Sequence, residues 1–225
     1  TLANANTVNE FTTNQVTLTS IADTFANITS IDAIDNAEVT IGTAEVNVLD
    51  TVTLANANTI NAYTTGQVTL NSISDTSANL ATLDAINTSE VTMANATVNV
   101  TDQVTKAQAD NINSYTTGQV TLNSISDTFA NITSIDAINT SEVTMANANI
   151  TVTNQVTKAQ ADAINSYTTG QVTLTSIADT LNNLSSINSL PDSEVMMQMA
   201  SLTVTDTATL ANANTVNEFT TNQVT

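Results

Sequence analysis

The first 17 residues of the chain, TLANANTVNEFTTNQVT, return letter for letter as residues 209–225. The offset between the two copies is 208 residues, four times 52, and a related repeat begins at each intermediate register. The repeats comprise residues 1–52, 53–104, 105–156 and 157–208, with a partial fifth repeat at 209–225. Repetition at a fixed period of this length is typical of solenoids, in which each repeat packs on its neighbours. We therefore predict that residues 1–225 form one continuous solenoid.

Apolar residues fall into columns when the repeats are aligned. Val16 and Leu18 flank Thr17, and this alternation is the period-two pattern of a half-buried β-strand. The same alternation occurs at residues 39–41 and 46–48. Each repeat is thus predicted to contribute three short strands.

Between the strands, the spacing of the apolar residues changes from two to three. Phe25, Ile28 and Ile31 are three apart, and a second series of this kind begins at Leu54. Such spacing fits one face of a short helix or a 3₁₀ turn. Two helical segments in 52 residues imply two unequal coils per repeat. The predicted fold is a repeat solenoid of parallel stacked strands with short helices or helical turns, and a pure β-helix is the alternative.

An aspartate stands before one helical segment of each full repeat. The four residues are Asp23, Asp75, Asp127 and Asp179. A side-chain oxygen at this position can accept hydrogen bonds from the first free N–H groups of a helix. Together with the column that begins at Asp32, these residues are also the candidates for calcium, which needs six to eight oxygen ligands. We favour capping, because the chain contains neither an EF-hand loop nor the calcium-binding nonapeptide.

One further column contains only glycine and asparagine. Its members are Asn14, Gly66, Gly118, Gly170 and Asn222. These two residue types are the ones that most readily adopt a positive φ angle. The column therefore predicts a left-handed residue that closes the helix before the next strand.

The fourth repeat departs from the others between residues 188 and 199, where it contains the only proline of the chain. Met196 stands where the earlier repeats have an outward-facing threonine. An exposed methionine is a flexible apolar side chain that often forms contacts. Met196, Met197 and Met199 are therefore candidates for a lateral contact between solenoids, with sequence drift in one repeat as the alternative.

The charge of the chain excludes several classes of partner. It has two lysines, no arginine and 21 acidic residues, for a net charge of −19. Binding to nucleic acid or to an anionic membrane surface depends on basic residues, so we expect neither. No apolar run reaches the length of a membrane span, so membrane insertion is not expected.

The absence of cysteine and histidine from the sequence removes thiol nucleophiles, Ser-His-Asp triads and the common zinc sites. Carboxylates are numerous, but each belongs to a repeat position or a turn rather than to a unique pair in a cleft. We therefore expect no enzyme activity, no catalytic residue and no cofactor, with calcium as the one candidate ion.

Short phrases recur throughout the chain. Examples are Val100-Thr101-Asp102, Ala78-Asn79-Leu80, Leu83-Asp84-Ala85 and Thr64-Thr65-Gly66-Gln67-Val68. In these phrases the whole chain resembles the repeat arrays of very large secreted bacterial surface proteins and adhesins. The resemblance implies an extracellular or cell-surface location and a mechanical or adhesive role, and it transfers no catalytic residue.

Taken together, these features predict a structural protein: a segment of an extracellular fibre or surface filament, or the stalk of an adhesin. Its expected partners are copies of itself, placed end to end or side by side. The alternative is a binding module that recognises a surface or a ligand. Ice binding is disfavoured, because the threonine row that begins at Thr17 and Thr19 is interrupted by Asn71 in the next repeat.

Overall fold

The computed structural model describes residues 1–225. Its internal contacts divide the chain into two compact regions. Region 1 comprises residues 1–101 and 111–120, and region 2 comprises residues 102–110 and 121–225. The prediction that residues 1–225 form one continuous solenoid stays a prediction.

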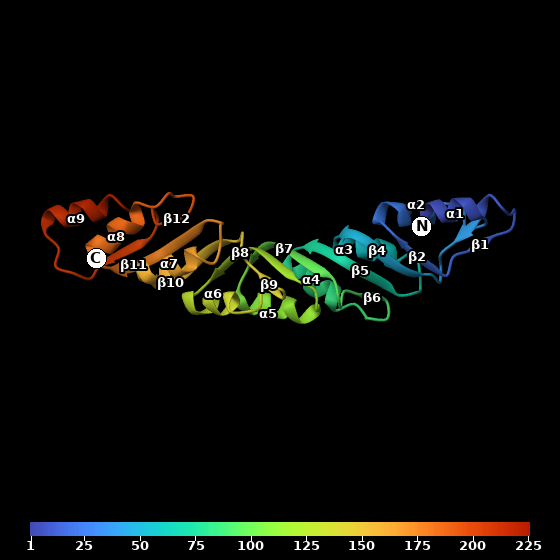
Figure 1. Cartoon of the computed structure of the whole chain (residues 1–225), viewed down its shortest axis with the longest axis horizontal. Helices are drawn as coiled ribbons and strands as arrows, with labels where there is room; N and C mark the ends of the chain where they lie inside the picture. The colour runs from blue at the N-terminus through green and yellow to red at the C-terminus, as the bar shows by residue number, and fades with distance from the viewer. The chain divides into compact units, whose positions relative to one another are not determined.

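Helices and strands alternate along both regions (Figure 1). Region 1 begins with α1 (Leu2–Asn9), β1 (Val16–Thr17), β2 (Ser20–Asp23), α2 (Phe25–Asp32), β3 (Val39–Thr40), β4 (Glu45–Val52), α3 (Leu54–Asn61), β5 (Val68–Asp75), α4 (Ser77–Asp84) and β6 (Val91–Thr92). Three elements contain residues of both regions: β7 (Thr97–Val104), α5 (Lys106–Tyr115) and β8 (Val120–Asp127). Region 2 continues with α6 (Phe129–Asp136), β9 (Val143–Thr144), β10 (Asn149–Val156), α7 (Lys158–Asn165), β11 (Val172–Asp179), α8 (Leu181–Asn188), β12 (Val195–Met196), β13 (Ser201–Val204) and α9 (Leu210–Asn217).

The strands within each region pair in parallel. In region 1, β4 pairs with β2 on one side and β5 on the other, which places Ile21, Val46 and Val68 in one row. In region 2, β10 pairs in the same way with β8 and β11. The β4–β5 and β10–β11 pairings each contain a bulge, at residues 49–50 and 153–154. Parallel pairing of successive coils confirms the predicted solenoid class.

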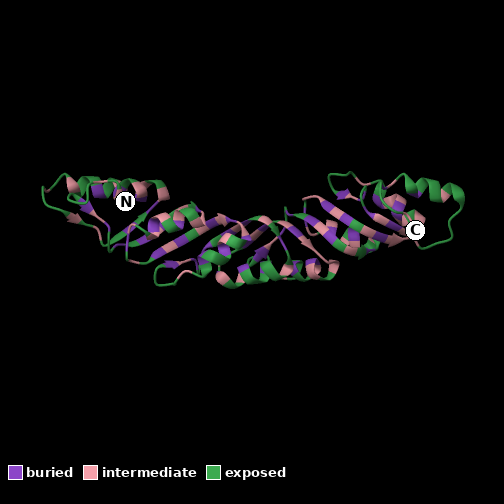
Figure 2. Cartoon of the chain, turned by 180° about the vertical axis from the view of Figure 1, so that it is seen from behind, coloured by how far each residue is buried: buried purple, intermediate pink, exposed green.

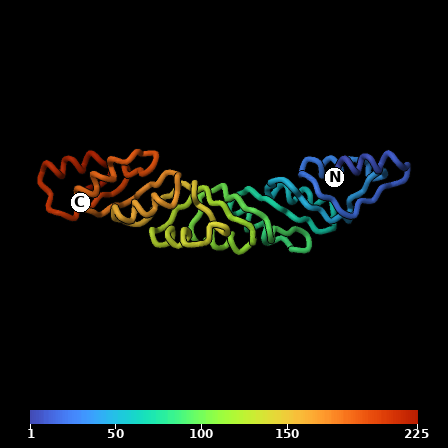
Figure 3. Tube along the Cα trace, viewed as in Figure 1, coloured from blue at the N-terminus to red at the C-terminus, as the bar shows by residue number.

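Each internal repeat contains two coils, as predicted. In the second repeat, α3 and β5 form one coil, and α4, β6 and β7 form the other, which carries the extra short strand. The Cα trace winds in this way through each region (Figure 3). The helical segments are α-helices, so the pure β-helix alternative is wrong. The α-helical form follows from a threonine cap at the start of a segment, such as Thr24, which accepts a hydrogen bond from the Asn27 N–H.

The core follows the two spacings seen in the sequence. Along β4, Val46, Val48 and Val52 are buried and the intervening residues are not. Along α2, Ile28 and Ile31 are buried. Buried residues alternate with intermediate or exposed ones along the strands of both regions (Figure 2). Each strand therefore buries one face, and the opposite face is largely polar.

The divergent stretch of the fourth repeat keeps the same fold as the other repeats. The carbonyl oxygen of Pro191 accepts hydrogen bonds from the N–H groups of Glu194 and Val195. The carbonyl of Asn139 holds the same turn in the third repeat. Strand β12 then pairs with β11. Residues 188–199 thus change the side chains of the coil without interrupting the stacking.

Candidate functional site

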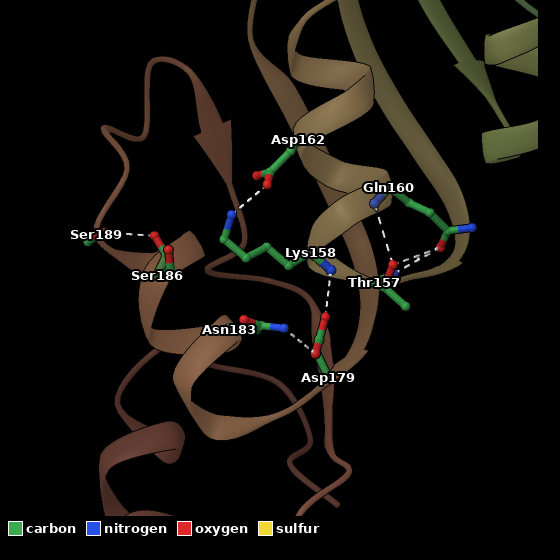
Figure 4. Close-up of polar contacts among 8 residues, drawn as sticks. All are labelled: Thr157, Lys158, Gln160, Asp162, Asp179, Asn183, Ser186 and Ser189. Atoms are coloured by element: carbon green, nitrogen blue, oxygen red, sulfur yellow. Dashed lines mark hydrogen bonds and ion pairs between the residues drawn. The ribbon is translucent and has the colours of Figure 1, made fainter.

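The column that contains Asp179 lies where two helices begin. Figure 4 shows the Asp179 carboxylate at the N-terminal ends of α7 and α8. One carboxylate oxygen accepts a hydrogen bond from the backbone N–H of Lys158, at 2.8 Å. The other accepts from the Thr180 N–H at 2.8 Å and from the Asn183 side chain at 2.7 Å. A single carboxylate thus caps its own helix and the helix one coil earlier.

The same geometry recurs in every full repeat, and we call it the aspartate clamp. Its members are Asp23, Asp75, Asp127 and Asp179. In each case the N–H of the first helical residue, 21 positions earlier, donates to the carboxylate at 2.8 Å. An asparagine four positions later donates to the other oxygen at 2.7 Å. Every clamp therefore links one coil to the next.

The hydrogen bonds to the clamp also determine its ionisation. Burial by itself would raise the pKa of these four carboxyls. The donated N–H groups favour the charged form more strongly, so each pKa lies below its ordinary value. The clamp carboxylates are therefore negatively charged at neutral pH.

This donor environment differs from that of a calcium site. Both oxygens of each clamp residue already face N–H groups, whereas calcium would need those oxygens as ligands. No group of three or more Asp, Glu, His or Cys residues is placed to hold a metal ion. Asp32, the other calcium candidate, lies at the end of α2, where burial raises its pKa. The geometry assigns the clamp aspartates to helix capping.

A second set of side chains accepts the first N–H of α2, α6 and α8, each from about 25 residues further along the chain. Asp50 accepts a hydrogen bond from the first N–H of α2 at 2.8 Å. Asn154 does the same for α6 at 2.7 Å, and Asp206 for α8 at 3.0 Å. The sequence does not reveal this set, because its members are not all of one residue type and because Asp50 and Asn154 lie within strands, away from the helices that they cap. The bulge at residues 49–50 could have been the signal, because it interrupts the period-two pattern of β4.

The glycine and asparagine column does not adopt the predicted left-handed conformation. Its members are Asn14, Gly66, Gly118, Gly170 and Asn222. No residue of the chain has a positive φ, so this prediction is wrong. At Gly66, a Cβ atom would lie 2.2 Å from the carbonyl oxygen of Ala44, one coil earlier. Glycine is needed here because two backbones approach closely.

The turn is closed instead by a buried threonine. The Thr64 hydroxyl donates to the Ala44 carbonyl at 2.6 Å and accepts from the Gly66 N–H at 2.9 Å. Thr116 and Thr168 repeat both contacts in the next two repeats. The repeated threonine was visible in the sequence, but its contact one coil away was not.

The methionine-rich segment of the fourth repeat is only partly at the surface. Met197 is 2% exposed, in the same core column as Ile41 and Met93. It cannot form a lateral contact, so the prediction is wrong for this residue. Met196 is half-buried on β12, and Met199 is 72% exposed. A lateral contact stays a prediction for these two residues.

The surface pockets next to the duplicated segments contain few ionisable groups. One pocket, of about 260 Å³, is lined by Asn9, Asn14 and Glu38 among others. A second, of about 190 Å³, contains Glu218 and Phe219. Each has a single carboxylate and no basic side chain, whereas acid–base catalysis uses a matched pair of groups. The absence of enzyme activity stays a prediction.

The fold and the clamp define the class of the protein as an α/β repeat solenoid. No protein-family model, curated protein or solved structure matches the chain. None of its helices combines the length and the apolar character needed to cross a membrane. Its repeated internal geometry is therefore the basis for a functional proposal.

Proposed function

We propose that the chain is a structural protein: a segment of an extracellular filament, or of an adhesin stalk. Its stacked coils act as a spacer of defined length and carry mechanical tension. The observation that carries this proposal is the aspartate clamp. It joins successive coils with the same contacts at Asp23, Asp75, Asp127 and Asp179. An interface that repeats unchanged can be extended by adding repeats, and its stability grows as a sum of neighbour terms.

Carboxylate and hydroxyl groups that could take part in catalysis or metal binding form hydrogen bonds within the fold instead. Both oxygens of each clamp carboxylate hold N–H donors, and Asp50 and Asp206 cap further helices. Thr64 is buried and holds the next turn. These assignments support a role in which the coils themselves are the functional element.

The charge of the chain fits this role. A net charge of −19 keeps neighbouring solenoids soluble and opposes non-specific association. The extracellular location rests on the composition and on the resemblance to bacterial surface repeat arrays. The proposed partners are further repeats of the same kind, in the same chain or in other copies.

Covalent arrays of different length test the proposal. Residues 53–156, which comprise two internal repeats, would be inserted once, twice or three times into the chain. The proposal predicts particles whose length in electron micrographs grows linearly, by about 10 Å for each 52-residue repeat, because each repeat adds two strands about 4.8 Å apart. A matched array with alanine at the clamp positions is the control. Compact particles that do not lengthen would contradict the proposal.

A further inference from the structure

A small cavity in the second repeat lies where two helices end. Asp84 is the last residue of α4 and Tyr115 is the last residue of α5, and both line the cavity. Its volume is about 50 Å³, and all the residues around it belong to region 1. The cavity is separate from the aspartate clamp, because the clamp carboxylate of this repeat, Asp75, precedes the start of α4.

The lining of the cavity combines buried apolar residues with accessible polar ones. The buried part consists of Leu83, Val91 and Met93, which are 2%, 3% and 4% exposed. Asp84 and Thr88 are exposed, and Thr92 and Tyr115 are half-buried. A ligand that fits this lining needs a polar group for the accessible part and a short apolar group for the buried part.

The Asp84 carboxylate has no cationic partner in the chain. The two lysines, Lys106 and Lys158, form ion pairs with Asp110 and Asp162 instead. The last turn of α4 contains no basic residue, although the free carbonyl groups at the end of a helix favour positive charge. The cavity therefore has the electrostatic character of a site for a cation.

Tyr115 adds a neutral aromatic ring beside this carboxylate. Burial and the charge of Asp84 both raise the pKa of the Tyr115 phenol, so the phenol is uncharged at neutral pH. In the third repeat, the equivalent Tyr167 hydroxyl contacts the Thr133 hydroxyl at 3.5 Å. Ala81 stands at the position of Thr133 in the second repeat, and alanine has no hydroxyl. The Tyr115 hydroxyl is therefore available to a ligand.

We propose that this cavity binds an alkylammonium group, that is, a primary ammonium on a short aliphatic chain. The ammonium group donates hydrogen bonds to the Asp84 carboxylate and to a hydroxyl of the accessible lining. Its positive charge is also attracted by the face of the Tyr115 ring. The methylene groups next to the nitrogen contact the apolar lining at Met93. This binding site goes beyond the structural role proposed above and does not depend on it.

The size and the lining of the cavity disfavour other classes of ligand. A volume of about 50 Å³ holds roughly four water-sized groups, which matches the end of a lysine side chain but is too small for a sugar or a nucleotide. A calcium ion would need six to eight oxygen ligands, whereas the cavity has one carboxylate and a buried apolar lining. A quaternary ammonium group has no N–H to donate to Asp84.

A titration with n-propylammonium chloride, followed by NMR of methionine methyl groups labelled with ¹³C, tests the site. The Met93 signal, identified with Met93→Leu, shifts and saturates as the amine is added, because Met93 lines the cavity. Met199 is 72% exposed and lies outside the cavity, so its signal stays in place. Sodium chloride at the same ionic strength moves neither signal, and tetramethylammonium chloride binds about tenfold more weakly.

The alkylammonium group could come from a free amine or from a lysine of another protein. N-acetyl-lysine methylamide presents the same group on a blocked amino acid. Binding at least as tight as that of n-propylammonium assigns the site to a protein lysine, and weaker binding assigns it to a free amine. Both results support an alkylammonium site.

Matched substitutions separate the site from the general negative charge of the chain. Asp84→Asn weakens n-propylammonium binding by about tenfold, because the charged acceptor is lost. The fourth repeat has asparagine, Asn188, at the equivalent position, so this variant keeps the fold. Glu90→Gln removes the same charge from a nearby residue outside the lining and leaves binding unchanged. Ala81→Thr supplies the hydroxyl that contacts tyrosine in the third repeat and weakens binding about threefold.

Three results would overturn the proposal: a Met93 signal that does not respond to n-propylammonium, equal binding by Asp84→Asn and Glu90→Gln, or tighter binding of calcium chloride than of n-propylammonium chloride at this site. Circular dichroism of each variant checks that the solenoid is intact. The structural role is tested separately, because the lengths of covalent arrays do not depend on whether this cavity holds a ligand. The two proposals can therefore fail independently.

Discussion

Residues 1–17 and 209–225 share one sequence and one local structure, yet their surroundings differ. Both form an eight-residue helix, α1 and α9. In both, the first threonine, Thr1 or Thr209, accepts a hydrogen bond at 3.3 Å from the N–H three residues later. The local sequence thus specifies the helix and its threonine cap wherever the segment lies.

Burial and clamping, in contrast, depend on the neighbouring coil. Val216 is fully buried and Val8 is not, although each occupies the same helical position. Leu2 donates its N–H to Asp23, whereas Leu210 has no clamp. The comparison teaches that a repeat of this chain is complete only when a coil lies on each side.

The largest expected effect comes from placing the asparagine of the duplicated segments into an internal coil. In Gly66→Asn, the new Cβ would lie 2.2 Å from the Ala44 carbonyl oxygen. Because coils on both sides prevent relaxation, we expect unfolding by urea to show a loss of about 3 kcal/mol. Asn222→Gly, the reverse change in the segment covered on one side, is the control and should change stability by less than about 0.5 kcal/mol. Equal effects would contradict the comparison.

Loss of a clamp should cost more than loss of a single cap. Asp75 accepts hydrogen bonds from Leu54, Thr76 and Asn79. We expect Asp75→Ala to lower the free energy of unfolding by about 2.5 kcal/mol, since hydrogen bonds to a charged group are lost on two helices. Asp50→Ala removes a cap from one helix and should cost about 1 kcal/mol. A cost for Asp75→Ala no larger than that for Asp50→Ala would show that the clamp does not link coils.

Truncation of the equivalent valines compares a side chain that is buried by a neighbouring coil with one that is not. Val216→Ala removes two fully buried methyl groups, and we expect a loss of about 2 kcal/mol in chemical denaturation. Val8→Ala alters a side chain that is 42% exposed and should change stability by less than about 0.5 kcal/mol. Equal losses in the free energy of unfolding for the two substitutions would show that the two segments have the same environment, contrary to the account.

Acid should weaken the clamps. Their pKa values are lower in the folded chain than in the unfolded one, so their stabilisation is complete above about pH 4, near the unfolded pKa, and is lost as the pH falls through the folded pKa. Burial raises the pKa of Asp32 and Asp136, which therefore act in the opposite direction. Because four clamps outweigh two such residues, we expect the midpoint temperature of thermal unfolding to decrease as the pH is lowered below about 4. An unfolding temperature that increases as the pH is lowered would contradict the assignment of the clamp aspartates to helix capping.

The smallest effect should come from the lysines, which are absent from the duplicated segments. Lys158 forms an ion pair with Asp162 on the surface of α7, where Leu210 stands in α9. Replacement of Lys158 by leucine should change the free energy of unfolding by less than about 0.5 kcal/mol. The change should shrink further in high salt, because dissolved ions screen an ion pair at the protein surface.

The sequence was sufficient to locate the elements but not the contacts between coils. The period-two pattern at Val16 and the period-three pattern at Phe25 correspond to β1 and α2, because these patterns arise within one segment. Asp50 and Gly66 act on residues 22 to 25 positions away, and this distance depends on how one coil lies on the next. Glycine also serves two purposes, positive φ and close approach, and composition alone cannot separate them.

The buried methionine illustrates a different reason for a missed assignment. Closeness in sequence and a shared residue type suggest the same role for Met196, Met197 and Met199. The parity of the strand, however, places Met197 in the inward column of Ile41, where it is buried. Strand parity is therefore a better guide than residue type in this fold.

Amide hydrogen exchange at the first residue of each helix, measured by NMR on the monomeric chain, tests the central claim that a following coil completes each repeat. The Leu54 and Lys158 amides donate to the Asp75 and Asp179 clamps. We expect both to exchange far more slowly than the amide of Leu210, which has no clamp. Protection of Leu210 equal to that of Lys158 would contradict the account.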